Sequence, residues 1–248
     1  MKKPKVIAVC VATMDHMGYF ENLKNSLRKF HTEEELPLAL IGPEQLKDNP
    51  DKDFFYRATP ILGRQFMDLG YDIVIKLDVD QIITGKLNHI WENVEYDVAV
   101  VQNSNPKEMA TFPVSVWDIP PMAYVNCGFV VMKSRVFVEH WLDLCFSPHF
   151  NNYQMREQDL LNILVYYGKY TVKMLDNSSK WHGLISKGYW LDLKLKDDKL
   201  MLPKGEWPND EDKEIVCLHW AGGNIPNKMN LNTQFKEDIS KWLTKLIK

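Results

Sequence analysis

The regular alternation of short apolar runs with amphipathic stretches is the feature that most limits how this chain can fold. Residues 6–12, 36–42 and 72–77 are rich in β-branched and aliphatic side chains, which is typical of buried strands. Between the second and third runs, Pro60 is predicted to open a helix. Between the first two runs, apolar side chains recur at helical spacing: Tyr19, Phe20, Leu23, Leu27 and Phe30. This β-α-β-α-β order predicts a parallel, doubly wound sheet.

The alternation continues along the rest of the chain. Further strands are expected over residues 97–101 and 123–132, each of which is mainly apolar. The helices expected to follow cover residues 134–146 and 156–168. Residues 194–213 are charged and contain prolines, which predicts a loop. A last strand is expected over residues 214–218 and a closing helix over residues 232–247. Because no linker-like composition interrupts the order, we expect one domain over residues 1–248.

Two carboxylates stand where the third predicted strand ends. Asp78 and Asp80 follow the apolar run directly, at the edge of an α/β sheet that usually carries ligands. Side chains two residues apart on a strand share a face, so both carboxylates can reach one divalent cation, which relieves their repulsion and can bind diphosphate oxygens. Other Asp-x-Asp copies, at residues 51/53 and 210/212, fall in polar stretches. The alternative for Asp78 and Asp80 is an aspartate cluster that caps the next turn.

A third ligand candidate ends the last predicted strand. His219 with the two aspartates would make a mixed oxygen and nitrogen site, which suits Mn²⁺ better than Ca²⁺, with Mg²⁺ as the alternative ion. This site requires the last strand to lie beside the strand that ends at Asp78. Gly222 would let the backbone approach a phosphate, and Lys228 would meet its charge. The alternative is a packed core histidine beside Trp220.

The charge balance, the cysteines and the lengths of the apolar runs indicate which partners and which cellular compartment to expect. The 30 basic and 33 acidic residues give a net charge of -3, which argues against a nucleic-acid partner. The 4 cysteines form no C-x-x-C pair, so we expect buried thiols in a reducing compartment. No apolar run is long enough for a transmembrane segment or a signal peptide, so a cytoplasmic location is expected, with peripheral membrane contact left open.

Five segments appear in one order along the chain: residues 12–15 with Tyr19, 77–80, 126–128, 157–162 and 219–222. Together they resemble the retaining glycosyltransferase family that includes glycogenin and bacterial lipopolysaccharide galactosyltransferases. The resemblance implies a single GT-A-type α/β domain, with a doubly wound, mostly parallel but mixed sheet flanked by helices. It also implies a nucleotide-binding half over residues 1–101 and a half for the donor sugar and the acceptor over residues 102–248.

The resemblance also implies which residues bind the donor. Thr13, Asp15 and Tyr19 would hold the uracil and ribose of a UDP-sugar, since a carboxylate can accept from the ring N–H and a tyrosine can stack. Asn126 and Gly128 would border the donor sugar, although Asn126 alone could equally be a strand-end turn residue. The remaining implied contacts to the donor or its diphosphate come from Val79, Gly222, Lys228 and one of two basic residues before the aspartate pair, Arg57 or Arg64.

The segment Glu157-Gln158-Asp159 resembles the family's Asp-Gln-Asp segment at the start of a helix. Gln158 would then lie near the anomeric carbon and Asp159 would bind sugar hydroxyls, stabilising an oxocarbenium-like centre if configuration is retained. If configuration is inverted, Asp159 or Glu157 would be the base. The alternative without the family context is a capping box or a solvated helix start.

The expected function is transfer of a sugar from a UDP-sugar to a hydroxyl of an unidentified acceptor, for which a glycan is expected. A sugar nucleotidyltransferase is the nearest rival, but residues 13–18 contain a single glycine where that class needs a glycine-rich loop. A haloacid-dehalogenase-type phosphatase would use Asp78 as nucleophile and Asp80 as acid. A non-catalytic sugar-nucleotide-binding protein is the third rival.

Overall fold

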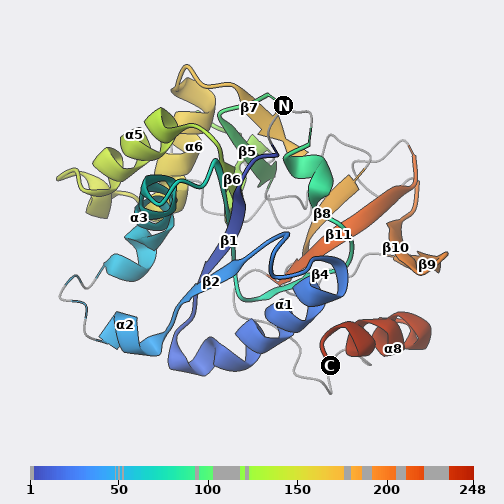
Figure 1. The fold of residues 1–248 in the computed structure, drawn as a ribbon. Helices are drawn as coiled ribbons and strands as arrows, with labels where there is room; N and C mark the ends of the chain where they lie inside the picture. The colour runs from blue at the N-terminus through green and yellow to red at the C-terminus, as the bar shows by residue number, and fades with distance from the viewer. Residues whose placement is uncertain are drawn as a thin grey trace.

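The structure is a computed structural model, and it describes residues 3–47, 49, 51, 53–92, 95–102, 118–120, 123–175, 180–185, 192–204, 211–220 and 235–248. Figure 1 shows a central sheet with helices on both faces and a second, smaller sheet beside it. The central sheet has the strand order β2-β1-β3-β6-β5-β7. Three of its five strand pairings are parallel, so the predicted mixed, mostly parallel sheet is confirmed.

The first half of the chain follows the predicted β-α-β-α-β order. Strands β1 (Val6–Val11), β2 (Leu38–Ile41) and β3 (Ile73–Leu77) are parallel, and α1 (Met17–Phe30), α2 (Pro43–Lys47) and α3 (Phe54–Asp68) connect them. Two details differ from the prediction. Pro60 lies inside α3 instead of opening it. Strand β2 is only partly buried, because it forms the edge of the sheet.

The second half completes the same sheet. Strand β6 (Val125–Met132) is antiparallel to both β3 and β5 (Val98–Gln102), between which it lies, and β7 (Val172–Met174) runs parallel to β5 at the far edge. Helices α5 (Arg135–Cys145) and α6 (Glu157–Tyr167) fall within the predicted ranges. Three short 3-10 helices complete the described connections: η1 (Met14–His16), η2 (Asn88–Ile90) and η4 (Phe150–Asn152).

Alternate side chains of β1 pack into two different hydrophobic cores, one on each face of the sheet. Ala8 and Cys10 join the core with Phe20, Leu23 and Leu27 of α1. On the opposite face, Ile7 and Val9 join a second core whose helical members come from α3, α5 and α6. This period-2 alternation explains why the strand is apolar on both faces, and why it had to lie between two helical layers.

The second sheet is where the sequence prediction was incomplete. Its strands are β4 (Gln81–Ile83), β11 (Lys213–Trp220), β10 (Lys199–Leu202) and β9 (Lys194–Lys196), with β8 (Lys180–Ile185) parallel to β11. The predicted loop over 194–213 is therefore wrong in its first part, where β9 and β10 form a hairpin. Asp197 and Asp198 close it at φ of 51° and 57°, a conformation that Asp tolerates better than most residues.

Helix α8 (Glu237–Leu246) packs its buried face on the second sheet. Residues 232–234, which were predicted to start it, lie outside the described residues. In the part of the chain that the structure describes, no helix is long and apolar enough to cross a membrane.

Candidate functional site

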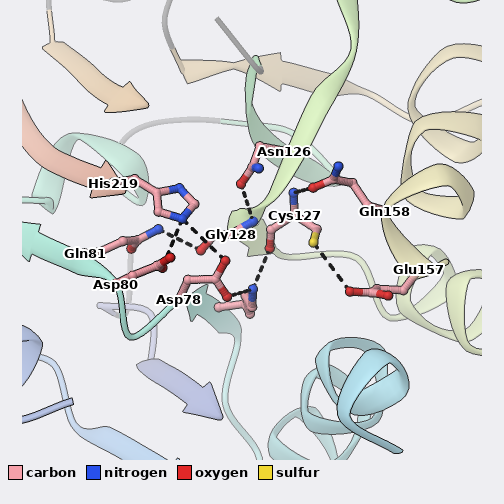
Figure 2. A network of polar contacts seen from close by, with 10 residues as sticks. Asp78, Asp80, Gln81, Asn126, Cys127, Gly128, Glu157, Gln158 and His219 are labelled. Atoms are coloured by element: carbon pink, nitrogen blue, oxygen red, sulfur yellow. Dashed lines mark hydrogen bonds and ion pairs between the residues drawn. The ribbon is translucent and has the colours of Figure 1, made fainter. Parts of the chain in front are cut away.

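The predicted carboxylate pair lies in the turn that joins the two sheets. Asp78, Val79 and Asp80 connect β3 of the central sheet to β4 of the second sheet. The backbone N–H of Asp78 donates to the carbonyl oxygen of Gly128 at 2.8 Å, which ties the start of the turn to β6. The side-chain amide of Gln81 donates to the same oxygen at 2.9 Å. The turn is therefore held from both sides, with its carboxylates beside His219 (Figure 2).

His219 reaches the aspartates by a route that the sequence analysis did not foresee. Strand β11 was expected beside the strand ending at Asp78, but it pairs with β4, where His219 is opposite Gln81. The backbone N–H of Trp220 also donates to the carbonyl oxygen of Asp80 at 3.0 Å. Since β4 begins directly after Asp80, pairing with β4 brings the imidazole to the carboxylates.

Three possible ligand atoms converge at this point. His219 Nε2 lies 3.1 Å from Asp80 Oδ1 and 3.5 Å from Asp78 Oδ2, and one ligand atom from each residue lies within 4.8 Å of the others. Both His219 Nε2 and Asp80 Oδ1 are buried, and they form an ion pair with each other only while the imidazole is protonated. A divalent cation would serve both atoms at once, and two carboxylates with one imidazole suit Mn²⁺ or Mg²⁺. The residues present therefore fit the expected metal.

The charges in this cluster are strongly coupled. Burial disfavours the charged imidazole, but the carboxylates of Asp80 and Asp78 outweigh it and raise the pKa of His219 to about 9. Burial likewise disfavours the charged carboxylate of Asp78, yet Lys76 and His219 hold the pKa of Asp78 well below its usual range. Without a metal, the two carboxylates thus draw a proton onto His219, and a bound cation would replace it.

Gly128 leaves the space in which these side chains meet. A Cβ atom at this position would lie 2.5 Å from Asp78 Oδ2 and 2.6 Å from Asn126 Oδ1, and closer still to the ring of His219. Asn126 Oδ1 accepts a hydrogen bond of 2.6 Å from the N–H of Gly128. Both residues therefore border the metal-ligand cluster from β6, as Figure 2 shows.

A cavity of 470 Å³ opens beside the cluster, a size typical of small-molecule sites. Five residues in its lining had been singled out from the sequence: Thr13, Asp78, Val79, Asp80 and Glu157. The sequence analysis missed the others: Val11, His16, Phe55, Tyr56, Thr59, Lys76 and Cys127. Of these, Lys76 did give a signal, because it is the one charged side chain in the apolar run Ile-Val-Ile-Lys-Leu.

The start of α6 presents its three polar residues differently. Glu157 lines the cavity, and its Oε2 is buried without a hydrogen bond. Burial raises the pKa of Glu157 to about 8. Gln158 Oε1 instead accepts from the N–H of Cys127 at 3.0 Å. Asp159 is fully buried, where it accepts from Tyr124 Oη at 2.5 Å and from the N–H of Met155 at 2.9 Å.

The residues expected at the nucleotide base lie near the end of β1. Thr13 Oγ1 is hydrogen-bonded to His16 Nδ1 at 2.6 Å, and both residues line the cavity. Asp15 is exposed in η1, and Tyr19 is partly buried against the first core with its ring 5.8 Å from that of His16. Neither Asp15 nor Tyr19 is among the described residues that line the cavity.

The two arginine candidates face other parts of the protein. Arg57 donates to Asp51 at 2.8 Å and to the carbonyl oxygen of Cys145 at 2.9 Å. Arg64 pairs with Asp68 at 3.2 Å and with Glu139 at 3.5 Å. Neither arginine is among the described residues that line the cavity. The other two predicted donor contacts, Gly222 and Lys228, lie outside the described residues.

No protein-family model and no curated protein matches this chain. Similar solved structures do exist. All of the chain matches 50% of the bifunctional glycosyltransferase WbbM, with a TM-score of 0.60 and 12% identity. The galactosyltransferase LgtC, solved in complex with donor and acceptor sugar analogues, matches 97% of this chain over 95% of its own, with a TM-score of 0.57 and 14% identity.

A third similar structure is a glycosyltransferase involved in glycosylation of the major capsid of PBCV-1. It matches 73% of this chain over 85% of its own, with a TM-score of 0.51 and 10% identity. At identities this low the likeness concerns the fold, and all three structures are glycosyltransferases. The chain thus has the GT-A glycosyltransferase fold that the five ordered segments predicted.

Proposed function

We propose that this protein is a metal-dependent glycosyltransferase that moves a sugar from a UDP-sugar to an acceptor hydroxyl on a glycan. The observation that carries the proposal is that His219 of β11 converges on Asp78 and Asp80, which lie in a turn at the wall of the cavity. When bound there, Mn²⁺ or Mg²⁺ would neutralise the charge that develops on the departing diphosphate. The fold, shared with known glycosyltransferases, supports the same reaction class.

In this proposal, different parts of the donor contact different walls of the cavity. The end of β1, with Thr13, holds the nucleoside, and the turn with Asp78 and Asp80 holds the diphosphate. The donor sugar then extends toward Glu157 at the start of α6. At neutral pH, a carboxyl with a pKa of about 8 is largely protonated, so Glu157 can donate a hydrogen bond to a sugar hydroxyl or to a phosphate oxygen.

Gln158 and Asp159 have a positioning role in this arrangement. Gln158 is hydrogen-bonded to Cys127 of β6, and Asp159 is hydrogen-bonded to Tyr124, the residue just before β6. These bonds attach the start of α6 to β6. That attachment fixes Glu157 with respect to the metal ligands. We expect retention of configuration because the Glu157-Gln158-Asp159 segment resembles that of the retaining family, whereas inversion would require Glu157, the member of that segment that lines the cavity, to act as the base.

The test is a screen of UDP-sugars with the purified protein in the presence and absence of Mn²⁺. Metal-dependent thermal stabilisation by a UDP-sugar, followed by release of UDP that is slow in water and faster with added glycan acceptors, is the expected result. Stabilisation without any UDP release would indicate a non-catalytic binding protein. Release of pyrophosphate from UTP and a sugar phosphate, or hydrolysis of a phosphate monoester, would overturn the proposal in favour of a nucleotidyltransferase or a phosphatase.

A further inference from the structure

The cavity contains one permanent positive charge that the proposed function has not used. Among its described lining residues, Lys76 is the only lysine or arginine. It is the fourth of the five residues of β3, where it pairs with Val9 on one neighbouring strand and with Val130 on the other. The residue is 6% exposed. A buried ammonium is costly unless it has partners, so its place in an apolar strand calls for a reason.

The partners of Lys76 place its ammonium beside the metal-ligand cluster. Nζ forms an ion pair with Asp78 Oδ1 and donates to the carbonyl oxygen of Cys127 at 2.9 Å. The other oxygen of Asp78, Oδ2, is the one that faces His219. An ammonium has three N–H donors, and the described residues supply acceptors for two of them. The third donor is available to an acceptor in the cavity.

Because of this ion pair, the two carboxylate oxygens of Asp78 face different cations: Oδ1 faces the ammonium of Lys76, and Oδ2 faces the expected metal ion. With Oδ1 held by Lys76, only Oδ2 remains for a metal, so Asp78 can bind the ion through one oxygen. The two carboxylates, the ammonium and one divalent cation together leave a single net positive charge when His219 is neutral. That charge, at the wall of a cavity of 470 Å³, suits an anion with several oxygens.

We propose that Lys76 binds a phosphate oxygen of the donor diphosphate next to the metal and, through Asp78, limits the metal to one oxygen of that carboxylate. This inference rests on the proposed function, because it assigns the diphosphate subsite of the same cavity. It explains why neither Arg57 nor Arg64 is required there, since both are engaged with other groups.

The test compares ligands that differ only in phosphate content. Uridine, UMP and UDP are titrated by calorimetry at saturating Mn²⁺ into the wild type, Lys76→Gln and Lys76→Arg, with Arg64→Gln as the control for loss of a positive charge outside the cavity. Lys76→Gln should weaken UDP roughly ten- to a hundredfold, as expected for loss of a charge-assisted hydrogen bond, with a smaller effect on UMP and none on uridine. Lys76→Arg should retain part of the UDP affinity, and Arg64→Gln should bind all three like the wild type.

A second measurement separates this role from a purely structural one. Mn²⁺ alone should bind Lys76→Gln at least as tightly as it binds the wild type, because the variant frees Asp78 Oδ1 and removes a repelling charge. Loss of Mn²⁺ binding, equal weakening of uridine and UDP, or an unchanged UDP affinity would each overturn the proposal. If the wild type itself does not bind UDP with Mn²⁺, the proposed function fails first, so the two failures are distinguishable.

A measurement on the wild type keeps the proposal testable even if Lys76→Gln does not fold. In protein labelled with ¹⁵N-lysine, the ammonium resonance that disappears in Lys76→Arg belongs to Lys76. It should shift when inorganic pyrophosphate is added with Mg²⁺, and not when uridine is added. An ammonium resonance that does not respond to pyrophosphate would rule out direct contact between Lys76 and the diphosphate.

Discussion

The substitution Gly128→Ala tests the site through its geometry. The added Cβ would lie 2.5 Å from Asp78 Oδ2 and 2.6 Å from Asn126 Oδ1, against about 3.4 Å for an ordinary contact. The ring of His219 is closer still. Two of the three metal-ligand side chains must therefore move by roughly 1 Å, an error that a metal site or a catalytic site does not tolerate. We expect Mn²⁺ binding to fall by at least ten- to a hundredfold.

The cost to folding should be smaller than the cost to binding. Overpacking a buried position by one methyl group typically destabilises a protein by about 1–3 kcal/mol. Gly128 has no positive φ, so alanine adds no backbone strain there. Gly18 in α1 is the matched control, because a Cβ at that position meets no atom within 4 Å. Gly18→Ala should keep full Mn²⁺ affinity and lose no stability, because the position is exposed in the first turn of α1 and alanine is the better helix former.

The assay is isothermal calorimetry with Mn²⁺, together with chemical denaturation of both variants. A folded Gly128→Ala protein that binds Mn²⁺ as tightly as the wild type would refute the geometry of the site. Equal loss of binding in Gly18→Ala would show that the effect is not local to β6.

Three further predictions concern the ligands, the base and the core. Asp80→Ala and His219→Ala should each weaken Mn²⁺ binding in calorimetry by roughly ten- to a hundredfold or more, and the double variant should lose little more, because groups that serve one ion act as a unit; additive losses would contradict a shared ion. Asp15→Ala should reduce the preference for UDP over GDP, and unchanged discrimination would place the base elsewhere. Burial lowers the pKa of His31 from 6.5 to about 4, and its Nε2 accepts from the N–H of Leu87 at 2.9 Å. The neutral form is therefore favoured by folding, so its stabilisation is complete above pH 6.5 and is lost as pH falls toward 4, up to about 3 kcal/mol. Denaturation of His31→Gln should show a shallower acid loss than the wild type, and parallel curves would contradict this.

The elements of the first half were determined by local sequence. Continuous apolar runs predicted β1 and β3, and apolar side chains at helical spacing predicted α1, whereas α3 was expected only from Pro60, which lies inside it. The aspartate pair was identifiable for the same reason: Asp78 and Asp80 follow a strand whose end is visible in the sequence, and strand ends in an open α/β sheet carry ligands.

The tertiary structure decided what lies opposite those carboxylates. Strand β4 has only three residues and no readable period, so its pairing with β11, which delivers His219, could not be inferred. The roles of Lys76, Arg57 and Arg64 were undecidable for a related reason. A single charged side chain contributes no hydrophobic periodicity, and each of these three has a partner distant in sequence as well as a near one. The distant partners are Cys127 for Lys76, Cys145 for Arg57 and Glu139 for Arg64. Sequence pattern determines which residues are buried together, whereas the direction in which a buried charge points depends on the neighbours that the fold supplies.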